Sequence, residues 1–520
     1  MNRIIERSIT GIMTLKTLSE MAALLPDSQR YGEDVEIAGL AYDSRQVVPG
    51  ALFVALAGAK SDGHDFIAEA LGRGAAALAI NSDRTAWYGE AGVPVIAVSD
   101  TRAALPVLAA HFYDAPSRQL QLVGVTGTNG KTTTAHMIES IFRIIGDRTG
   151  MIGTLGGVIN GKPVALERTT PESADLQRMF AEMVEQGVRR VVMEVSSEGA
   201  QQGRTTGCAF DIGVFTNLTQ DHLNTHGTME AYFEQKLRLF TEYPDAFPEK
   251  TFIGVVNGDD GYGQRIIAAL EAAGRSVLRY SMDDESATIR ARIHEVNPSG
   301  TQFDILYQPP VGSTVIIPVS LRLGGLFNVQ NALAAAGAAL AARVPPVAIQ
   351  NGLEALSGVP GRFETVETGD RGFHVIVDYA HTPDGLQRVL ESARALNPVR
   401  LISVFGCGGD RDPKKRPIMG EISAEIADIT IVTSDNPRTE NPDAILAEIL
   451  TGIPGGVDGA RVFAQVDRRL AIEQALCEVA QPGDLVVIAG KGHESGQQFA
   501  HHKIPFDDRQ VAREVLAQCS

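Results

Sequence analysis

The strongest local signal for chemistry is a glycine-rich turn at residues 123–133, with the sequence Val-Gly-Val-Thr-Gly-Thr-Asn-Gly-Lys-Thr-Thr. An apolar strand pattern enters this turn and a helical pattern leaves it. Glycines let backbone N–H groups surround phosphate oxygens, a lysine supplies a positive charge, and a threonine hydroxyl can bind Mg²⁺. The strict pattern has glycine six residues before the lysine, where Val125 stands, but the rest of the turn is kept. The sequence therefore predicts an ATP-binding loop of Gly127, Thr128, Asn129, Gly130, Lys131, Thr132 and Thr133.

Two polar residues follow other apolar runs. Glu194 comes directly after residues 191–193, at a place where nucleotide-hydrolysing enzymes hold Mg²⁺ with an acid. Because the phosphate loop lies upstream, we expect a metal ligand here rather than a helix cap or a surface charge. His222 also lies just beyond a predicted strand, and a lone histidine at such a place is usually structural.

The elements that must position these groups are typical of an α/β protein. Glycine (53) and proline (25) recur between apolar runs, and β-rich runs alternate with helical patterns, which favours largely parallel sheets. The 520 residues, at roughly 100–200 per domain, indicate about three domains. The 44% of apolar residues can bury a core in each, and the 21% of charged residues exclude a disordered chain.

We expect domain limits near residues 103 and 345. A helix at residues 101–113 leads into the second block, and an alanine-rich helix after Asn328 closes it. Strands are predicted at residues 51–56, 75–80 and 95–98, then at 121–125, 190–195, 212–216 and 252–256, and finally at 374–377, 401–405, 429–433 and 485–488.

Charge limits the partners. With 46 Lys and Arg against 63 Asp and Glu, the net charge is −17, and an acidic surface repels the backbone of nucleic acids. A small phosphorylated ligand needs only a local positive pocket, so it stays possible. The sequence therefore predicts no nucleic-acid partner.

Cysteine usage and hydropathy indicate the compartment. Cys208, Cys407, Cys477 and Cys519 show no spacing typical of a zinc site or a disulfide framework, which fits a reducing compartment. The first 20 residues lack a continuous hydrophobic segment, and charge and prolines interrupt the most apolar stretch, residues 331–349. We expect a cytoplasmic protein without membrane insertion.

A phosphate loop alone leaves kinases, GTPases and ligases open, but the order of further motifs narrows the choice. After the loop come Asn-Leu at 217–218 with Asp-His at 221–222, Asn328 with Asn331, Pro-Gly-Arg-Phe-Glu at 360–364, and Asp-Tyr-Ala-His-Thr-Pro at 378–383. In this order the chain resembles the Mur ligases, ATP-dependent enzymes that add amino acids during peptidoglycan synthesis. The resemblance covers nearly the whole chain.

The third block sharpens the resemblance. It carries Gly-Cys-Gly-Gly-Asp-Arg-Asp at 406–412, Ser-Asp-Asn-Pro-Arg-Thr at 434–439 and Ala-Gly-Lys-Gly-His-Glu at 489–494. These resemble the branch of the family that extends UDP-N-acetylmuramoyl-L-alanyl-D-glutamate. Asp-Asn-Pro-Arg resembles the form that selects meso-2,6-diaminopimelate, whereas lysine-adding relatives usually differ there.

The resemblance implies a division of labour between domains. Residues 1–103 would bind the UDP precursor, residues 104–345 would form a central parallel-sheet domain that binds ATP, and residues 346–520 would form a Rossmann-like domain that binds the amino acid. Monomers are expected, with closure of the third domain before chemistry.

The resemblance also implies the reaction and its cofactors, ATP and Mg²⁺. The γ-phosphoryl of ATP moves to the D-glutamyl side-chain carboxylate, and the amine then attacks the acyl phosphate and expels phosphate. Catalysis would rest on Lys131, His222 and Lys236, the last as a carbamate that offers an anionic oxygen to a second Mg²⁺. The implied metal set is Thr132, Glu194, His222 and the carbamate of Lys236, and further nucleotide contacts are Asn328, Asn331, Arg362, Asp378 and His381.

Precursor contacts are carried over in the same way. The matching positions are Ser44, Thr169, Thr170, Ser196, Gln202 and Arg204, whose hydroxyls, amide and guanidinium suit a ligand with phosphates and carboxylates. The chain departs from the common pattern at Arg168, where Asn is common, at Glu198, where His is common, and at Ala59 and Lys60, in a segment that often includes His-Gln.

The predicted amino-acid site is Arg411, Asp435, Asn436, Pro437, Arg438, Gly490 and Glu494. Diaminopimelate differs from lysine by a second carboxylate, which the planar fork of Arg438 can bind through two hydrogen bonds, with Arg411 as a further cation. Asp435 and Glu494 can receive the distal ammonium group, and Gly490 leaves room. Asn-Pro also often starts a turn, so the motif could simply end a strand.

Two other functions stay open. One is a lysine-adding ligase of the same family, and a folylpolyglutamate-synthase-like ligase is a more distant variant of this alternative. The other is a non-catalytic nucleotide-binding module, which damage at Lys131, Glu194 or Lys236 would favour, and all three residues are intact.

Overall fold

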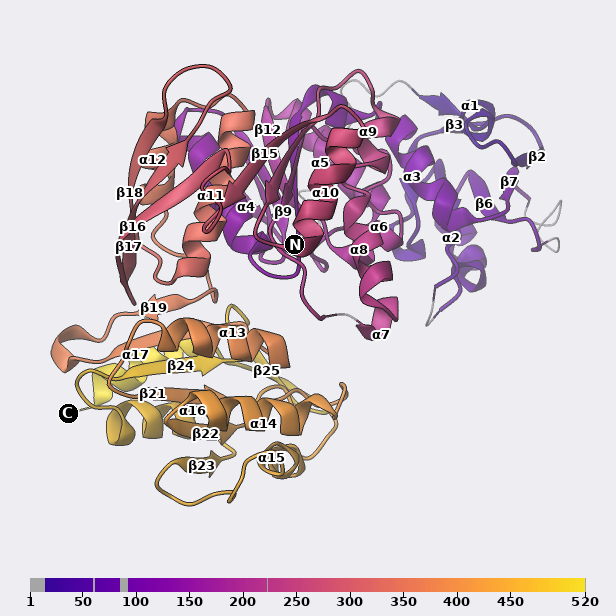
Figure 1. Ribbon diagram of the computed structural model, residues 1–520. Coiled ribbons are helices and arrows are strands. Elements are labelled where there is room, and N and C mark those ends of the chain that lie inside the picture. The colour runs from indigo at the N-terminus through magenta and orange to yellow at the C-terminus, as the bar shows by residue number, and fades with distance from the viewer. Residues whose placement is uncertain (1–14, 59–60, 85–91, 222, 520) are drawn as a thin grey trace.

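The computed structural model describes residues 15–58, 61–84, 92–221 and 223–519. Each of its three main sheets carries its own helices, and this arrangement confirms the predicted α/β class and three-domain architecture (Figure 1). The domain limits at residues 103 and 345 stay predictions. His222, Ala59 and Lys60 lie outside the described residues, as do residues 1–14 of the N-terminal segment.

The first sheet has the order β2-β7-β6-β5-β4, and all its neighbours are parallel except β2 against β7. Apart from the half-buried Asn81, the residues of β5, β6 and β7 are buried because helices cover the sheet. Its strands are β2 (Gln29–Tyr31), β4 (Gly39–Ala41), β5 (Ala51–Val54), β6 (Ala77–Asn81) and β7 (Val95–Val98), beside the pair β1 (Lys16–Thr17) and β3 (Glu36–Ile37). Its helices are α1 (Leu18–Ala23), α2 (Ile67–Gly72), α3 (Thr101–Phe112) and the short turns η2 (Ser44–Gln46) and η3 (Gly63–Phe66).

The central sheet has eleven strands in the order β11-β10-β9-β12-β8-β13-β14-β15-β16-β17-β18. In sheet order, the seven strands β9-β12-β8-β13-β14-β15-β16 are parallel to one another. Antiparallel hairpins extend the sheet at both edges. The strands are β8 (Gln121–Thr126), β9 (Thr149–Gly153), β10 (Gly156–Ile159), β11 (Lys162–Val164), β12 (Arg190–Glu194), β13 (Ile212–Phe215), β14 (Ile253–Asn257), β15 (Ser276–Ser281), β16 (Ile289–Asn297), β17 (Gly300–Tyr307) and β18 (Val315–Leu321).

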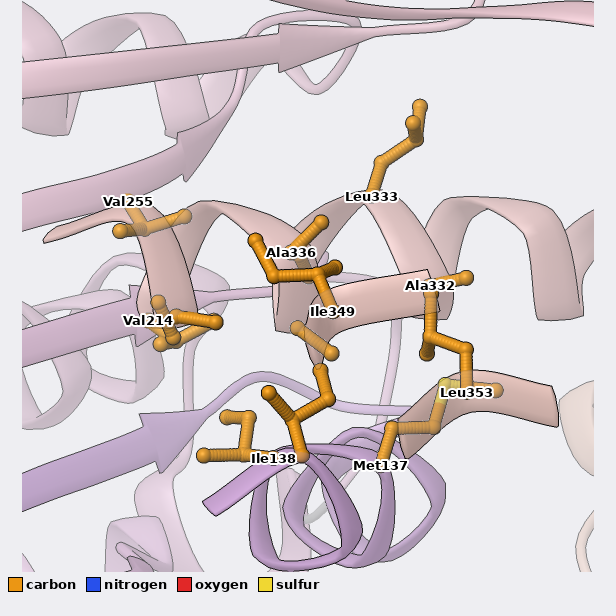
Figure 2. Packing of buried hydrophobic residues seen from close by; sticks show 14 of the residues in the cluster. Met137, Ile138, Val214, Val255, Ala332, Leu333, Ala336, Ile349 and Leu353 are labelled. Atoms are coloured by element: carbon orange, nitrogen blue, oxygen red, sulfur yellow. The ribbon is translucent and has the colours of Figure 1, made fainter. Parts of the chain in front are cut away.

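The helices of the central block close both faces of its sheet. They are η5 (Pro116–Gln119), α4 (Lys131–Ile144), α5 (Ser173–Glu185), α6 (Ser197–Gln201), α7 (Leu223–His226), α8 (Met229–Leu237), α9 (Glu242–Ala246), α10 (Gly261–Ala272), α11 (Leu326–Ala341) and α12 (Pro346–Ala355). Figure 2 shows Ile138 of α4, Ala336 of α11 and Ile349 of α12 in one buried cluster with Val255 of β14. Small side chains let α11 lie this close, and α12, beyond the predicted limit at residue 345, belongs to the same core.

The third sheet has the order β19-β20-β24-β21-β22-β23, parallel except for β19, with helices on both faces. Strand β24 enters last along the chain yet lies between β20 and β21, so the loops after these strands meet at one edge. The strands are β19 (Glu364–Val366), β20 (His374–Asp378), β21 (Leu401–Phe405), β22 (Ile429–Thr433), β23 (Val462–Gln465) and β24 (Leu485–Ala489), beside the pair β25 (Gly496–Gln498) and β26 (Lys503–Pro505). The helices are η6 (Gly369–Arg371), α13 (Pro383–Arg394), α14 (Lys415–Ile426), α15 (Pro442–Leu450), α16 (Arg468–Glu473), the π-helix η7 (Gln474–Val479) and α17 (Asp508–Gln518).

Cysteine pairing corrects the sequence interpretation. Cys477 and Cys519 form a disulfide across 42 residues, with Cα atoms 5.6 Å apart. Spacing could not reveal it, because the pairing depends on η7 and α17 packing side by side in the folded domain. Cys208 and Cys407 are free and buried, as expected of small residues that fill space.

The apolar stretch at residues 331–349 divides into the C-terminal part of α11 and the start of α12, with Arg343 in a left-handed conformation between them. Among the residues that the structure describes, no helix is long and apolar enough to cross a membrane.

The contact between α4 and α12 gives a test of this core. A Cβ added at Gly352 would lie 2.4 Å from the Ile141 Cα atom, and that backbone cannot move aside alone. Gly352→Ala should therefore lower the free energy of local opening around α4 by about 1–3 kcal/mol, measured by amide hydrogen exchange. Gly72→Ala is the control, since its Cβ would meet nothing within 4 Å. Unchanged exchange of α4 in Gly352→Ala would contradict this packing.

Candidate active site between the central and third domains

The predicted phosphate loop connects β8 to α4. Gly127 and Gly130 have φ of +147° and +84°, a region that favours glycine. A Cβ at Gly127 would lie 1.9 Å from the Thr216 hydroxyl oxygen, and one at Gly130 would lie 2.3 Å from Asn331 Oδ1. The backbone is thus tightly enclosed at the N-terminus of α4, where N–H groups without helical partners favour an anion.

Side chains around the loop suit a triphosphate. Lys131 Nζ donates to the carbonyls of Gly127 (2.9 Å) and Thr128 (2.8 Å), contacts that phosphate oxygens can replace. Arg362 of the third domain donates to Thr132 Oγ1 at 3.4 Å, and its buried Nε has no protein partner. A buried guanidinium nitrogen with no acceptor fits an anionic ligand.

Glu194 lies directly behind Thr132. Its carboxylate accepts hydrogen bonds from Thr132 Oγ1 (3.2 Å), the Thr154 amide (2.9 Å) and the Thr154 hydroxyl (3.0 Å). Among the residues that the structure describes, no three His, Cys, Asp or Glu side chains gather as a metal cluster. Mg²⁺ typically takes one or two protein ligands and completes its shell with phosphates and water, so Thr132 and Glu194 fit the part predicted for them.

A cavity of about 710 Å³ opens above the loop, between the central and third domains. Its volume is that of a small-molecule site. Asn328, outside the lining, accepts a hydrogen bond from Asn331 at 3.1 Å and so supports it from behind. The predicted residues that line the cavity are Thr128, Asn129, Gly130, Lys131, Thr133, Thr169, Thr170, Ser196, Arg204, Lys236, Asn331, Arg362, Asp378 and His381.

Lys236 is the most buried cation of this cavity, with 2% of its surface exposed. Its ammonium nitrogen donates to the Gly127 carbonyl at 2.8 Å and lies 4.5 Å from the centre of the Tyr232 ring. Burial, and then the nearby charge of Lys131, hold the pKa of Lys236 well below its ordinary value. The neutral form of the Lys236 amine is therefore favoured over the charged ammonium form far more than it is at a surface lysine.

The cavity wall that includes Arg168 and Arg204 is organised by Glu172. This buried carboxylate lies 2.7 Å from Arg102, 3.6 Å from Arg168 and 3.7 Å from Arg204, so three guanidinium groups share one acid. Arg204 also lies 3.6 Å from Glu198. The two departures from the family pattern at positions 168 and 198 thus join one charged network at the cavity wall.

Two predicted precursor contacts do not line the cavity. Gln202 accepts a hydrogen bond from Arg204 at 2.5 Å and lies one contact behind the wall. Ser44 lies in the first domain and donates to Glu69 at 2.8 Å, so the structure does not bring it to the cavity.

A second cluster forms at the carboxyl ends of β22 and β24. Asn436 donates to Glu494 (2.8 Å), and the fully buried Lys491 donates to both Asn436 Oδ1 (3.1 Å) and Glu494 (2.9 Å). Asp435 Oδ2 is buried without a partner, and a Cβ at Gly490 would lie 2.5 Å from it. An unpaired carboxylate oxygen beside a glycine leaves room and charge for a cationic group.

The guanidinium groups near this cluster differ in exposure. Arg438, at φ +51°, donates to the Gly409 carbonyl at 2.7 Å, so the loop after β22 packs against the loop after β21. The Pro437 carbonyl also packs against Gly409, so closely that a Cβ at Gly409 would lie 1.9 Å from its oxygen. Arg411 is exposed and donates to Asp410 of its own loop at 3.0 Å, so the structure does not bring it into the cluster. None of the predicted amino-acid residues lines the cavity.

A buried ion pair holds the floor of this cluster. Arg468 and Asp508, both fully buried, pair at 2.7 Å, and Arg468 also donates to the carbonyls of Ser434 (3.3 Å) and Ala489 (2.9 Å). These carbonyls belong to the ends of β22 and β24. A single guanidinium therefore fixes the spacing of the two motif-bearing loops.

Sequence reasoning missed several residues of these sites. Tyr232 lies four residues before Lys236 on α8, a spacing that places two side chains on one helix face and could have revealed it. Lys491 lies inside the motif at residues 489–494, but the sequence gives no sign that it is buried. Asp384 contacts the phosphate loop only through the folded domain interface, so no local pattern could reveal it.

Comparisons with known proteins agree with this geometry. Three family models match the chain: the Mur ligase family, catalytic domain, at residues 36–113, the Mur ligase middle domain at 125–339, and the Mur ligase, glutamate ligase domain at 361–492. The chain belongs to the Mur ligase family. Mur ligases form amide bonds at the expense of ATP, so this chain is an ATP-dependent ligase.

Two curated relatives extend the likeness of this Mur ligase over almost its whole length. A UDP-N-acetylmuramoyl-L-alanyl-D-glutamate--2,6-diaminopimelate ligase of Gloeobacter violaceus is 47% identical over 507 residues, which is 97% of this chain and 99% of the relative. The protein of the same name from Bacillus licheniformis is 45% identical and covers 94% of this chain and 96% of its own.

Solved structures show the same fold. A UDP-N-acetylmuramoyl-L-alanyl-D-glutamate--2,6-diaminopimelate ligase shares 35% identity with this Mur ligase at a TM-score of 0.66, over 93% of this chain and 95% of its own. A MurF of Acinetobacter baumannii, at 20% identity and a TM-score of 0.63 over 97% of this chain and 98% of its own, supports the fold alone.

Gly130 gives a test of the phosphate loop. Gly130→Ala would push Asn331 away and disturb the loop, so the Kd for ATP should rise by about tenfold or more, measured by calorimetry. Gly146→Ala is the matched control, because its φ of +81° imposes the same backbone strain while its Cβ would meet nothing within 4 Å. Equal loss of affinity in both variants would contradict the assigned role.

Proposed function

We propose that this Mur ligase joins meso-2,6-diaminopimelate to the D-glutamyl side-chain carboxylate of UDP-N-acetylmuramoyl-L-alanyl-D-glutamate, with hydrolysis of ATP to ADP and phosphate. The observation that carries the proposal is the cluster of Asp435, Asn436, Arg438 and Glu494 at the carboxyl edge of the third sheet. Its acids and guanidinium suit an amino acid with an ammonium and a carboxylate at its far end. The names of the relatives at 45–47% identity support the same substrate.

The cavity would serve the first half of the reaction. Gly127–Thr133 and Lys131 would hold the phosphates, with Arg362, Asp378 and His381 of the third domain closing over the nucleotide. Thr132 and Glu194 would hold Mg²⁺, with His222 as the further ligand that the resemblance implies, and this metal would offset the negative charge of the reactants. Thr169, Thr170, Ser196 and Arg204 line the opposite wall, where the precursor carboxylate would wait for the γ-phosphoryl group.

The third domain would serve the second half. Glu494 stays anionic there, because Lys491 and Asn436 outweigh the effect of burial and lower its pKa. Asp435 and Glu494 would hold the distal ammonium, and Arg438 the distal carboxylate, which leaves the other amine free to attack the acyl phosphate. Attack at the carbonyl carbon forms the amide and expels inorganic phosphate, while the amine releases its proton.

Lys236 would act as a carbamate. Its neutral nitrogen can add to the carbon of CO₂ and release one N–H proton to solvent. The product R–NH–COO⁻ keeps one N–H, so the hydrogen bond to the Gly127 carbonyl can persist. The new carboxylate oxygens would then lie inside the cavity beside Tyr232 and the phosphate loop. This geometry supports the role of Lys236 as an anionic ligand for a second Mg²⁺.

The proposal includes a monomeric enzyme in the cytoplasm. Its runner-up is the lysine-adding activity of the same family, because lysine shares the ammonium group and lacks only the distal carboxylate. A binding-only module does not fit, because the chain belongs to a family that forms amide bonds at the expense of ATP.

Substrate competition tests the selectivity. With ATP, Mg²⁺ and the UDP precursor, wild-type protein should form product with meso-diaminopimelate and discriminate against L-lysine by about 10³- to 10⁴-fold in kcat/KM, because lysine brings no distal carboxylate to Arg438. Arg438→Met should remove most of this preference, whereas the control Arg411→Met should change it little, since Arg411 lies outside the cluster. Comparable use of both amino acids by the wild type would refute the selectivity, and product with neither would refute the function.

Carbamylation has a direct spectroscopic test. Protein equilibrated with ¹³C-bicarbonate should show a carbamate carbon resonance in the NMR spectrum that disappears in Lys236→Arg. The control Lys162→Arg, at an exposed position of β11, should leave the resonance in place. A spectrum that is the same in wild type and Lys236→Arg would show that this lysine is not modified.

A further inference from the structure

Besides Arg362, an acid of the third domain, Asp384, contacts the phosphate loop. Asp384 lies in the first turn of α13, three residues after His381. Helix α13 lies on the side of the third domain that faces the central domain (Figure 1). The Oδ2 atom of Asp384 accepts hydrogen bonds from Asn129 Nδ2 at 3.2 Å and from the Thr219 hydroxyl at 3.1 Å. Both donors belong to the central domain.

The two donors are themselves fixed to the loop. The Asn129 amide donates to Asn217 Oδ1 at 3.0 Å, and its carbonyl accepts from the Thr216 hydroxyl at 2.6 Å. The Thr219 amide donates to Thr128 Oγ1 at 3.0 Å. A carboxylate that accepts hydrogen bonds from both side chains therefore fixes the third domain to the phosphate loop as a whole.

A negative group beside a triphosphate site needs a counter-charge. Arg388, one turn further along α13, donates through Nε to both oxygens of Asp384 at 3.1 and 2.9 Å and also lines the cavity. This partner limits the repulsion between Asp384 and bound phosphate. The acid can thus remain at the loop when the nucleotide is present.

We propose that Asp384 is a positioning residue that docks the third domain on the phosphate loop, and that Arg388 neutralises it in the docked state. The inference rests on the proposed function and adds the contact through which the amino-acid domain is aligned with ATP. Asp384 touches no reacting atom in this account. Its role is to keep the amino-acid-binding third domain aligned with the phosphate loop of the central domain while the amine attacks.

The test combines kinetics with scattering. Asp384→Ala should lower kcat by about 10- to 100-fold, the effect of losing hydrogen bonds to a charged group. The Kd for ATP should change less than about twofold, because the phosphate-loop contacts of the central domain stay intact. Asp384→Asn, which keeps an acceptor oxygen, should recover most of kcat. Small-angle scattering with nucleotide and precursor should show the compact form for wild type and a more open form for Asp384→Ala.

A double-mutant cycle separates a direct contact from a general loss of stability. Thr219→Val should lower kcat, and Thr219→Val combined with Asp384→Ala should cost little more than Asp384→Ala alone. Glu421→Ala, at an exposed acid on α14, is the control that should retain full activity. Additive losses, or wild-type kcat and compaction in Asp384→Ala, would overturn the proposal. Wild-type protein that forms no product would refute the proposed function instead, and the scattering of the variants would still test the docking.

Discussion

The hydrogen bonds between residues 216–219 and the phosphate loop are the interaction on which the rest of the site depends. Thr216 and Asn217 bind the backbone of Asn129, Asn217 accepts from the Thr128 amide at 2.8 Å, and Lys236 holds the Gly127 carbonyl at 2.8 Å. Side chains at Gly127 or Gly130 would break this enclosure. Because β8 and β13 are neighbouring parallel strands, their carboxyl ends bring these loops together without long connections.

The second cluster, in the third domain, also forms because the carboxyl ends of neighbouring parallel strands bring their loops together. The loops after β21, β22 and β24 meet at one edge, where they hold Asn436, Glu494 and Lys491 in one hydrogen-bonded group. The buried pair of Arg468 and Asp508 fixes that edge from below. Removing one partner of such a pair is costly because it leaves a buried charge, so the pair secures geometry more than net stability. In the proposed reaction, the carboxyl edges of the central and third sheets then need only approach each other to bring ATP, the precursor and the amino acid together.

Sequence patterns predicted the strands that bear motifs far better than the rest. The predictions at residues 401–405 and 429–433 coincide with β21 and β22, since these strands are buried on both faces and read as continuous apolar runs. The hairpins β10–β11 and β16–β18 were not predicted. Their strands bury only some of their residues, such as Phe303 and Val319, and pairing with neighbours defines them.

For the site, residue type and order located the phosphate loop and the cluster of Asp435, Asn436 and Glu494, but did not show how deeply these residues are buried. Nothing in the local sequence shows that Lys236 and Lys491 are buried, that Arg411 is exposed or that Ser44 lies away from the cavity. Those properties depend on contacts between residues far apart in the chain. The disulfide between Cys477 and Cys519 and the contact of Asp384 with Asn129 belong to the same class.

In the proposed reaction, the cavity unites the γ-phosphoryl group of ATP with the precursor carboxylate. The most direct measurement of this step uses precursor labelled with ¹⁸O in the D-glutamyl side-chain carboxylate, followed by mass spectrometry of the phosphate released. We expect one ¹⁸O atom in each inorganic phosphate, because the departing phosphate keeps one carboxylate oxygen when the amine attacks the acyl phosphate. Phosphate without label, or label in AMP, would contradict phosphoryl transfer to that carboxylate.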